Sequence, residues 1–341
     1  MTDRKNGIQV TALLSVLHMA VDFLCGAALY AGAAAGRVSM PDFLLYNFCA
    51  FALQMPFGVL IDAMTSQNEK PDLPGRIAVA AGVVLTVAGV FAGPLVLGLG
   101  NALFHVGGGV LTIRQDDHCG FKGRALGVFV APGAIGLAAG TLLGQMQAER
   151  MYVLAVTVVS ALLCVLLFRT KEAAERQEMK LPDKSVLPGA LILSLVVVIR
   201  SMAGLAMKFS WKSGVLMIML SAVAAAGGKA AGGFLAAKLN MRRAAVLSLL
   251  LAAECFYESS AAAAGLLGLF LFNMSMPMTL YGLKRRMPSM PGFAFGILTF
   301  ALFIGYLLAC IPALSAVDSS LMGIIASLLS MAMLAVVLRE E

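Results

Sequence analysis

Charge is scarce in this sequence. Only 13% of the 341 residues are Asp, Glu, Lys or Arg, whereas a soluble domain carries about 25%. A protein with so few charges cannot face water over most of its surface, so a soluble globular protein is excluded. The net charge of +7 could suggest a nucleic-acid partner, but the basic residues lie in short loops between apolar runs. Membrane topology explains them better, and no nucleic acid is expected to bind.

Several chemical motifs are also missing. The six cysteines form no C-x-x-C pair, and no metal-site spacing occurs among them. The glycine-rich runs contain no G-x-x-x-x-G-K-S/T phosphate loop, so ATP-driven work by this chain alone is not expected. No nucleophile-plus-base spacing is evident. The sequence therefore predicts neither an enzyme nor a cofactor.

Long apolar runs make up most of the sequence. The chain is 60% hydrophobic, and runs long enough to cross a bilayer, about 20 residues, follow one another with short connections. We predict an all-α polytopic membrane protein with twelve spans. They lie near residues 9–35, 42–63, 76–92, 94–114, 123–144, 151–169, 188–209, 213–237, 243–259, 261–283, 292–313 and 318–338.

The basic residues predict the orientation of these spans. Arg200 and Lys229 fall inside spans, and only Arg37, Arg150, Lys208 and Lys212 fall in loops on the side opposite the termini. All other lysines and arginines lie on the side of the termini. Because cytoplasmic loops carry the excess of Lys and Arg, both termini are expected in the cytoplasm of a bacterium, with the spans in its inner membrane.

The sequence also repeats itself. Residues 58–62 read GVLID at the end of the second span, and 233–237 read GFLAA at the end of the eighth. Residues 123–128 read GRALGV at the start of the fifth span, and 292–297 read GFAFGI at the start of the eleventh. Two parallel six-helix halves of this kind are typical of the major facilitator fold. Gly58, Asp62 and Gly233 are thus predicted to have conformational or structural roles.

The polar loop in the middle of the chain divides these halves. We predict an N-terminal half over 1–169, a cytoplasmic linker over 170–187 and a C-terminal half over 188–341. By analogy of fold, a monomer is expected.

Two motifs resemble a known family. Residues 17–22 read LHMAVD in the first span, and 98–105 read GLGNALFH in the fourth. Together with 224–246, they resemble the fosmidomycin-resistance-type branch of the major facilitator superfamily. That branch carries a similar His-x-x-x-Asp and a glycine-rich run ending in Phe-His. The resemblance implies a proton-driven transporter of small organic molecules, often an efflux protein.

The sequence departs from the pattern of that branch at three positions. Val106 stands where a proline usually follows the histidine of the fourth span. Ala63 stands where a basic residue usually follows the aspartate, and Ala237 stands where the second half would repeat that aspartate.

Ionisable and amide side chains at membrane depth are the candidates for function. A charge there costs about 2.5–3.5 kcal/mol on insertion scales, so such residues usually face protein or a water-filled cavity. In the major facilitator fold, spans one, four, seven and ten line the centre. We expect His18, Asp22, Asn101, His105, Arg200 and Asn273, which lie in those four spans, to bind substrate or couple protons.

Roles follow from the chemistry of these groups. Asp22 is predicted to carry the proton, and His18 and His105, whose imidazoles titrate near neutral pH, to relay protons or bind substrate. Arg200 could pair with Asp22 or hold an anionic group through its planar fork. Lys229 and Glu254, on neighbouring spans, are expected to form a structural ion pair.

The resulting prediction is a secondary active transporter that moves a small polar or anionic organic solute by alternating access, coupled to protons. The alternatives are multidrug efflux of lipophilic cations and divalent metal transport through His18, Asp22 and His105. From other classes, an intramembrane enzyme and a sensor that has lost transport also stay open.

Overall fold

The computed structural model describes residues 2–147, 151–173 and 178–338, and these residues form helices and connecting loops without any strand. Arg150, which was assigned to the outer loops, lies outside the described residues, as does the middle of the predicted linker over 170–187. An all-helical chain suits a bilayer, because each helix bonds its own backbone groups and the bilayer core holds no water to bond exposed ones.

The helices are α1 (Thr2–Ala34), α2 (Met40–Asn47), the π-helical turn η1 (Phe48–Ala52), α3 (Gln54–Gln67), α4 (Leu73–Ala92), α5 (Pro94–His118), α6 (Arg124–Gln145), α7 (Met151–Phe168), the 3₁₀ turn η2 (Lys184–Val186), α8 (Leu187–Ala206), α9 (Gly214–Leu239), α10 (Met241–Tyr257), α11 (Ala262–Asn273), α12 (Ser275–Arg286), α13 (Pro291–Ala309), α14 (Pro312–Ser315) and α15 (Ser319–Val337).

The predicted fold class is confirmed. Among the described residues, 11 helical stretches are long and apolar enough to cross a membrane. The remaining predicted span corresponds to α10, which has 17 residues and a length of about 26 Å. It is therefore only slightly shorter than the hydrocarbon core of about 30 Å.

Two predicted spans are interrupted helices. The span over 42–63 contains α2, η1 and α3, and the span over 261–283 breaks at Met274 between α11 and α12. Pro277 explains the second break, because it has no N–H to bond the carbonyl of Asn273 and its ring would clash with that carbonyl. In contrast, α6 continues through Pro132.

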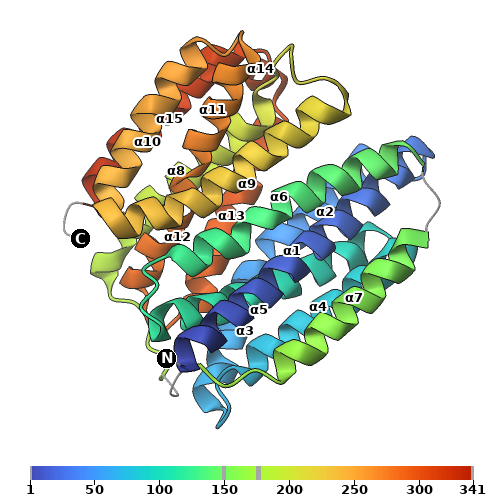
Figure 1. Cartoon of the computed structure of the whole chain (residues 1–341), viewed down its shortest axis with the longest axis vertical. Coiled ribbons are helices and arrows are strands. Elements are labelled where there is room, and N and C mark those ends of the chain that lie inside the picture. Colours follow the sequence, from blue (N-terminus) through green and yellow to red (C-terminus); the bar gives the residue numbers. More distant parts are fainter. Residues whose placement is uncertain (1, 148–150, 174–177, 339–341) are drawn as a thin grey trace.

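The spans form two groups, seen at the lower right (α1–α7) and the upper left (α8–α15) of Figure 1. Contacts between the groups run mainly from α3 to α13 and from α6 to α9. Within the first group, α1 packs closely along α6. A side chain at Gly136, Gly140 or Gly144 of α6 would meet the backbone of α1, so these glycines permit the close approach.

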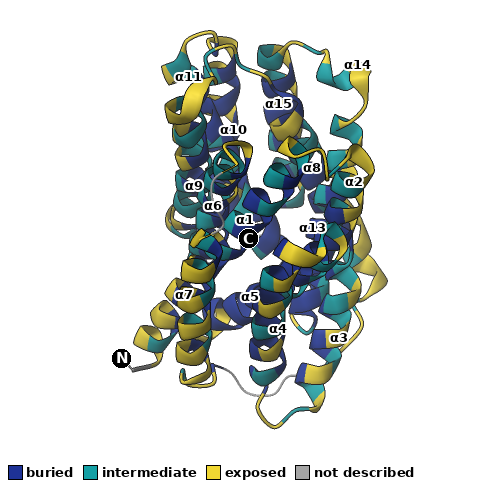
Figure 2. Cartoon of the chain, turned by 90° about the vertical axis from the view of Figure 1, so that its right-hand side faces the viewer, coloured by how far each residue is buried: buried dark blue, intermediate teal, exposed yellow. Residues whose placement is uncertain are grey.

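The surface of the bundle is apolar, as a lipid environment demands. Helix α7, much of which is exposed in Figure 2, turns Leu154, Leu162 and Phe168 outward. An exposed apolar surface that runs along a whole helix suits acyl chains rather than water.

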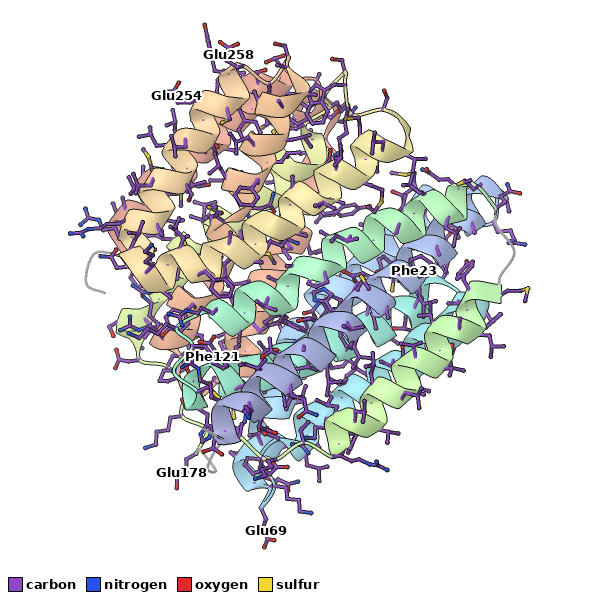
Figure 3. All side chains as sticks on the ribbon, in the orientation of Figure 1. Phe23, Glu69, Phe121, Glu178, Glu254 and Glu258 are labelled. Atoms are coloured by element: carbon purple, nitrogen blue, oxygen red, sulfur yellow. The ribbon has the colours of Figure 1, made fainter. Side chains whose placement is uncertain are left out.

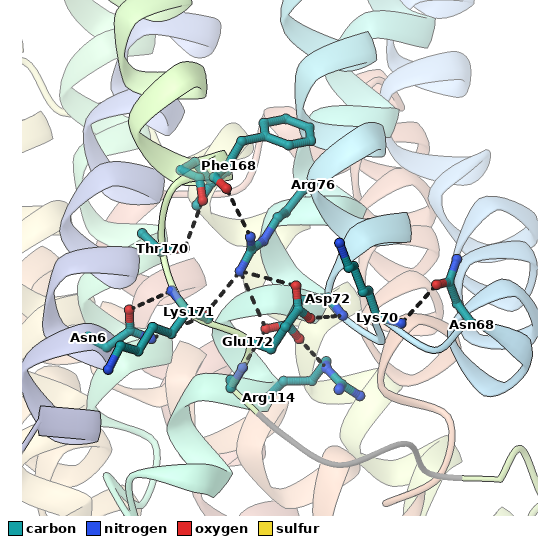
Figure 4. A network of polar contacts seen from close by, with 12 residues as sticks. Asn6, Asn68, Lys70, Asp72, Arg76, Arg114, Phe168, Thr170, Lys171 and Glu172 are labelled. Atoms are coloured by element: carbon teal, nitrogen blue, oxygen red, sulfur yellow. Dashed lines mark hydrogen bonds and ion pairs between the residues drawn. The ribbon is translucent and has the colours of Figure 1, made fainter.

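A polar network anchors the beginning of the loop between the halves (Figure 4). The Asp72 carboxylate accepts from Arg114 Nε at 2.7 Å and from the backbone N–H of Ala173 at 2.7 Å. Arg76 lies 3.6 Å from the Glu172 carboxylate and donates to the carbonyl oxygen of Lys171 at 3.1 Å. Residues 171–173 are thereby attached to the first group of helices.

Candidate functional site

Three of the predicted residues meet at one point between α1 and α5. His18 and Asp22 lie one turn apart on α1, with His18 Nε2 3.2 Å from Asp22 Oδ2. His105 on α5 brings its Nε2 to 2.9 Å from His18 Nε2 and 3.5 Å from Asp22 Oδ1. Both histidines are buried, and the Asp22 side chain is 16% exposed. These three residues are called the His–Asp cluster below.

The backbone fixes the tautomers of both histidines. Nδ1 of His18 lies 2.8 Å from the carbonyl oxygen of Phe129, and Nδ1 of His105 lies 2.8 Å from that of Asn101. Because a carbonyl oxygen can only accept, each Nδ1 must carry a hydrogen and donate it. In the neutral rings, both Nε2 atoms then present lone pairs to each other and to the carboxylate. Such a contact becomes favourable when a proton or another cation occupies it.

Two further residues complete the surroundings of the cluster. Asn101 donates from Nδ2 to Asp22 Oδ1 at 3.2 Å. Gly133 of α6 covers the other side, where a side-chain carbon would overlap His18 Nε2 and Asp22 Oδ2. A residue with a side chain at 133 would therefore displace the cluster.

The second group of helices contributes cations. Arg200 of α8 is 7% exposed, and its Nη1 has no hydrogen-bond partner among the described residues. It makes no ion pair with Asp22 within 4.0 Å, so the predicted possibility of a direct pair is not realised. Lys229 of α9 is half-buried and interacts electrostatically with both Asp22 and Arg200.

The predicted ion pair between Lys229 and Glu254 is wrong. Glu254 is exposed and points away from the bundle on α10 (Figure 3), whereas Lys229 is half-buried and interacts electrostatically with Asp22 and Arg200. The two residues lie on adjacent spans, but on faces that do not meet. An apolar run that is hydrophobic all round does not reveal which face of its helix is central.

Asn273 lies at the end of α11, beside α9. Its Nδ2 donates to the carbonyl oxygen of Leu269 at 2.8 Å, and a side-chain carbon at Gly228 would lie 3.2 Å from its Cβ. It therefore neighbours the α9 segment that carries Lys229, and no hydrogen bond joins it to the His–Asp cluster among the described residues.

The residues predicted to be conformational form contacts between the two groups of helices. Asp62 of α3 accepts from the backbone N–H groups of Gly292 and Phe293, each at 2.8 Å, at the beginning of α13. Gly58 has no room for a side chain, because a Cβ there would overlap the backbone of Gly292. Gly233 of α9 fits against Gly123 in the same way, where its Cβ would lie 2.6 Å from the carbonyl oxygen.

Lys284 of α12 adds an ion pair with Asp117 at the end of α5. This pair and the Asp62 contacts lie at the ends of α3, α5 and α12 and at the beginning of α13, which we call the terminus-bearing end because α1 begins there. The two groups are therefore closed against each other at this end.

The sequence did not single out Phe129, Gly133 and Lys229 as members of the central site. Phe129 contributes only a carbonyl oxygen, so its residue type carries no signal. Gly133 is one glycine among many in the apolar spans, and Lys229 had the one available signal, an ionisable side chain inside a span.

No protein-family model matches the sequence, and no curated protein matches it either. Solved structures do. The major facilitator superfamily transporter FucP in its outward conformation matches with a TM-score of 0.66 at 12% identity, covering 97% of this chain and 99% of FucP. A variant of the E. coli fucose:proton symporter FucP matches with a TM-score of 0.69 at 13% identity, over 99% and 98%.

The human organic anion transporter MFSD10 matches with a TM-score of 0.65 at 14% identity, over 97% of this chain and 99% of that protein. Sequence identities this low do not indicate a shared substrate. The alignments nevertheless cover nearly the full length of both this chain and each neighbour. An integral membrane protein whose described residues form 11 apolar helices of spanning length, and which aligns with such neighbours over 97–99% of its chain, has the fold of a major facilitator superfamily transporter.

Proposed function

We propose that this chain is a proton-coupled secondary transporter that moves a small polar or anionic organic solute by alternating access. The proposal includes the resemblance to the fosmidomycin-resistance-type branch, a cytoplasmic location for both termini in a bacterial inner membrane, and action as a monomer. Structural neighbours that are a fucose:proton symporter and an organic anion transporter support transport of this kind.

The single observation that carries proton coupling is the contact between the two histidines. With both Nδ1 atoms donating to carbonyl oxygens, a proton placed on either Nε2 is shared across 2.9 Å with the other ring. The resulting imidazolium is neutralised by the Asp22 carboxylate 3.2 and 3.5 Å away. Loss of that proton leaves two facing lone pairs beside a carboxylate, so the protonated and deprotonated clusters favour different arrangements of α1 and α5.

Alternating access requires a closed end that can open. Asp62 and the Lys284–Asp117 pair hold the terminus-bearing end together through a few polar contacts. Contacts of this size can be exchanged for others at modest cost, because each contributes on the order of 1–3 kcal/mol. Rocking of one half against the other would break them and expose the central residues on that side.

Divalent metal transport is the second candidate, because the ligand atoms of His18, Asp22 and His105 lie within 4.8 Å of one another. The Nδ1 hydrogen bonds to backbone are also what metal-bound histidines make. Lys229 opposes this reading, since its ammonium group interacts with the same carboxylate and repels a dication. Arg200 and Lys229 similarly disfavour efflux of lipophilic cations.

The test is transport by purified protein in liposomes. A thermal-stability screen against small anions, lipophilic cations and divalent metals supplies the substrate, since ligands that bind the native state raise the melting temperature. With that substrate, an imposed pH gradient should drive accumulation by the wild type. We expect Asp22→Asn to abolish this accumulation while the protein keeps its fold and its melting temperature.

Asp183→Asn is the matched control, because Asp183 is an exposed carboxylate in the connecting loop. Wild-type accumulation by Asp22→Asn would refute the proposal. Uptake of Zn²⁺ or Co²⁺ that needs both histidines and ignores organic solutes would replace it with metal transport.

A further inference from the structure

Arg200 is a buried cation without a counterion. Its residue exposure is 7%, its Nη1 is inaccessible to water, and neither a hydrogen bond nor an ion pair to it occurs among the described residues. At Nη1 this guanidinium has lost its hydration and gained no acceptor in return. Other buried arginines of the chain are compensated: Arg114 lies 2.7 Å from Asp72, and Arg76 contacts Asp72 and Glu172. Arg200 therefore differs from the structural arginines.

Lys229 on α9, the next helix, is a second central cation without a close counterion. It interacts electrostatically with Arg200, which carries the same charge, and no carboxylate lies within 4.0 Å of its ammonium group among the described residues. Asp22 is the one carboxylate that attracts it electrostatically, and that carboxylate already contacts both histidines and Asn101. The centre of the protein thus holds more positive than negative charge.

We infer that Arg200 and Lys229 form an oxyanion-binding site on α8 and α9, which holds the carboxylate, phosphate or similar head group of an organic anion. The inference rests on the proposed transport function and narrows its substrate to an anion. An oxyanion between these side chains would supply the missing acceptor of Nη1 and neutralise the repulsion between the two cations. The planar guanidinium offers paired donors for such a group, and the ammonium adds a point charge.

The site is separate from the His–Asp cluster. The cluster belongs to α1 and α5 in one half, and the oxyanion site belongs to α8 and α9 in the other. Lys229 is the link, since it interacts electrostatically with Asp22 and Arg200 together. An anion that binds Lys229 competes with Asp22 for the same ammonium group, which couples the two halves through one side chain.

Thermal unfolding of the detergent-purified full chain tests the site without a transport assay. The probes are inorganic phosphate, sulfate and succinate, with chloride at the same ionic strength as the reference. We expect at least one of these oxyanions to raise the melting temperature of the wild type saturably, by mass action on the native state. Arg200→Met and Lys229→Met should each weaken that apparent affinity by about tenfold or more, the effect of about 1.4 kcal/mol.

The two variants also report on the fold. Because they remove a central charge that has no carboxylate within 4.0 Å among the described residues, each should melt at the wild-type temperature or above it when no oxyanion is present. Arg200→Lys keeps the charge but loses the fork, and should bind more weakly than wild type and more strongly than Arg200→Met. Arg243→Met, which removes an exposed cation of α10, is the control for non-specific binding and should leave the affinity unchanged.

The inference is overturned if no oxyanion exceeds chloride on the wild type, if the Met variants bind the probes as well as wild type, or if both variants melt well below it. Asp22→Asn separates this result from proton coupling, because it should keep the stabilisation by oxyanions. Retained oxyanion binding without any flux would refute the transport proposal and leave the site standing.

Discussion

The central site depends on contacts made by backbone as much as on side chains. In water, each imidazole would exchange between its two neutral tautomers. In the protein, the carbonyl oxygens of Phe129 and Asn101 accept from Nδ1 of His18 and His105, respectively, and so select the tautomer with Nδ1–H in both rings. The Nε2 atoms consequently face each other as acceptors. Two ordinary hydrogen bonds, each 2.8 Å long, thus leave two acceptors facing each other, a contact that a shared proton or another cation would stabilise.

Gly133 is the residue that makes room for this arrangement. In Gly133→Ala the added methyl group would overlap His18 Nε2 and Asp22 Oδ2, so the cluster or α6 must shift. We expect proton-coupled transport in liposomes to fall roughly tenfold, which corresponds to about 1.4 kcal/mol on a coupled equilibrium. Gly204→Ala is the matched control, because a side-chain carbon at Gly204 of α8 meets no atom within 4 Å. Equal loss in both variants would contradict a specific role for Gly133.

At the scale of elements, the loop between the two halves is held at its beginning. Asp72 precedes α4 and is almost completely buried. Its carboxylate accepts hydrogen bonds from Nε of Arg114 on α5 and from the backbone N–H of Ala173. Asn6 of α1 also accepts from the backbone N–H of Lys171 at 3.0 Å. Residues 171–173 are therefore attached to α1, α4 and α5 and are expected to move with them.

Asp72→Ala tests this anchor. The substitution leaves the buried guanidinium groups of Arg76 and Arg114 without their shared carboxylate, and breaking such a pair costs about 3–5 kcal/mol. We expect a marked fall of the melting temperature in detergent and faster proteolysis of the loop. Glu69→Ala removes an exposed carboxylate nearby and should change stability by less than about 0.5 kcal/mol. If both variants were equally stable, the loop would not be anchored through Asp72.

The beginnings of α6 and α13, which the predicted repeat relates to each other, bond different carboxylates. Asp62 of the first half bonds the beginning of α13 across the interface, but the equivalent position on α9 is Ala237. The N–H groups at the beginning of α6 are instead satisfied by Asp116 of the same half, with Oδ2 2.7 Å from the nitrogen of Gly123. The carboxylate at the beginning of α13 therefore comes from the other half, whereas the carboxylate at the beginning of α6 comes from the same half.

At the scale of the whole molecule, Asp62 contributes a buried carboxylate to the contact between the two groups of helices at the terminus-bearing end. In Asp62→Asn the negative charge at the N-terminus of α13 is lost, which is worth about 0.3–1 kcal/mol and up to about 2 kcal/mol where the group is partly buried. We expect the population that is open at the terminus-bearing end to rise several-fold. The Lys284–Asp117 pair should keep part of the closed population.

Distances between spin labels measure this shift. Labels at the exposed positions Gln67 and Arg243 lie on different halves at the same end of the bundle, so opening should lengthen the distance between them. Glu178→Gln, an exposed change in the connecting loop, should leave the distribution as in wild type. An unaltered distribution in Asp62→Asn would show that closure does not depend on this carboxylate.

The sequence by itself determined the fold class and most of the spans. Apolar runs of about 20 residues form helices in a membrane, and the boundary between the predicted spans over 76–92 and 94–114 coincides with the boundary between α4 and α5. The sequence also picked out His18, Asp22, Asn101 and His105, because ionisable and amide groups are conspicuous against an apolar background. The bounds of the two halves and of the linker stay a prediction.

Only the tertiary structure decided which of these groups meet. Asp62 accepts hydrogen bonds from Gly292 and Phe293, which lie more than 200 positions away in the sequence. The donors are backbone N–H groups, which cannot be recognised from the residue type. Lys229 turned out to interact electrostatically with Asp22 and Arg200, whereas Glu254 is exposed. The physical reason is the same in each case. The position of a residue along a membrane span fixes its depth in the bilayer. Where the span is apolar on all sides, only packing against neighbouring helices fixes the direction in which the side chain points.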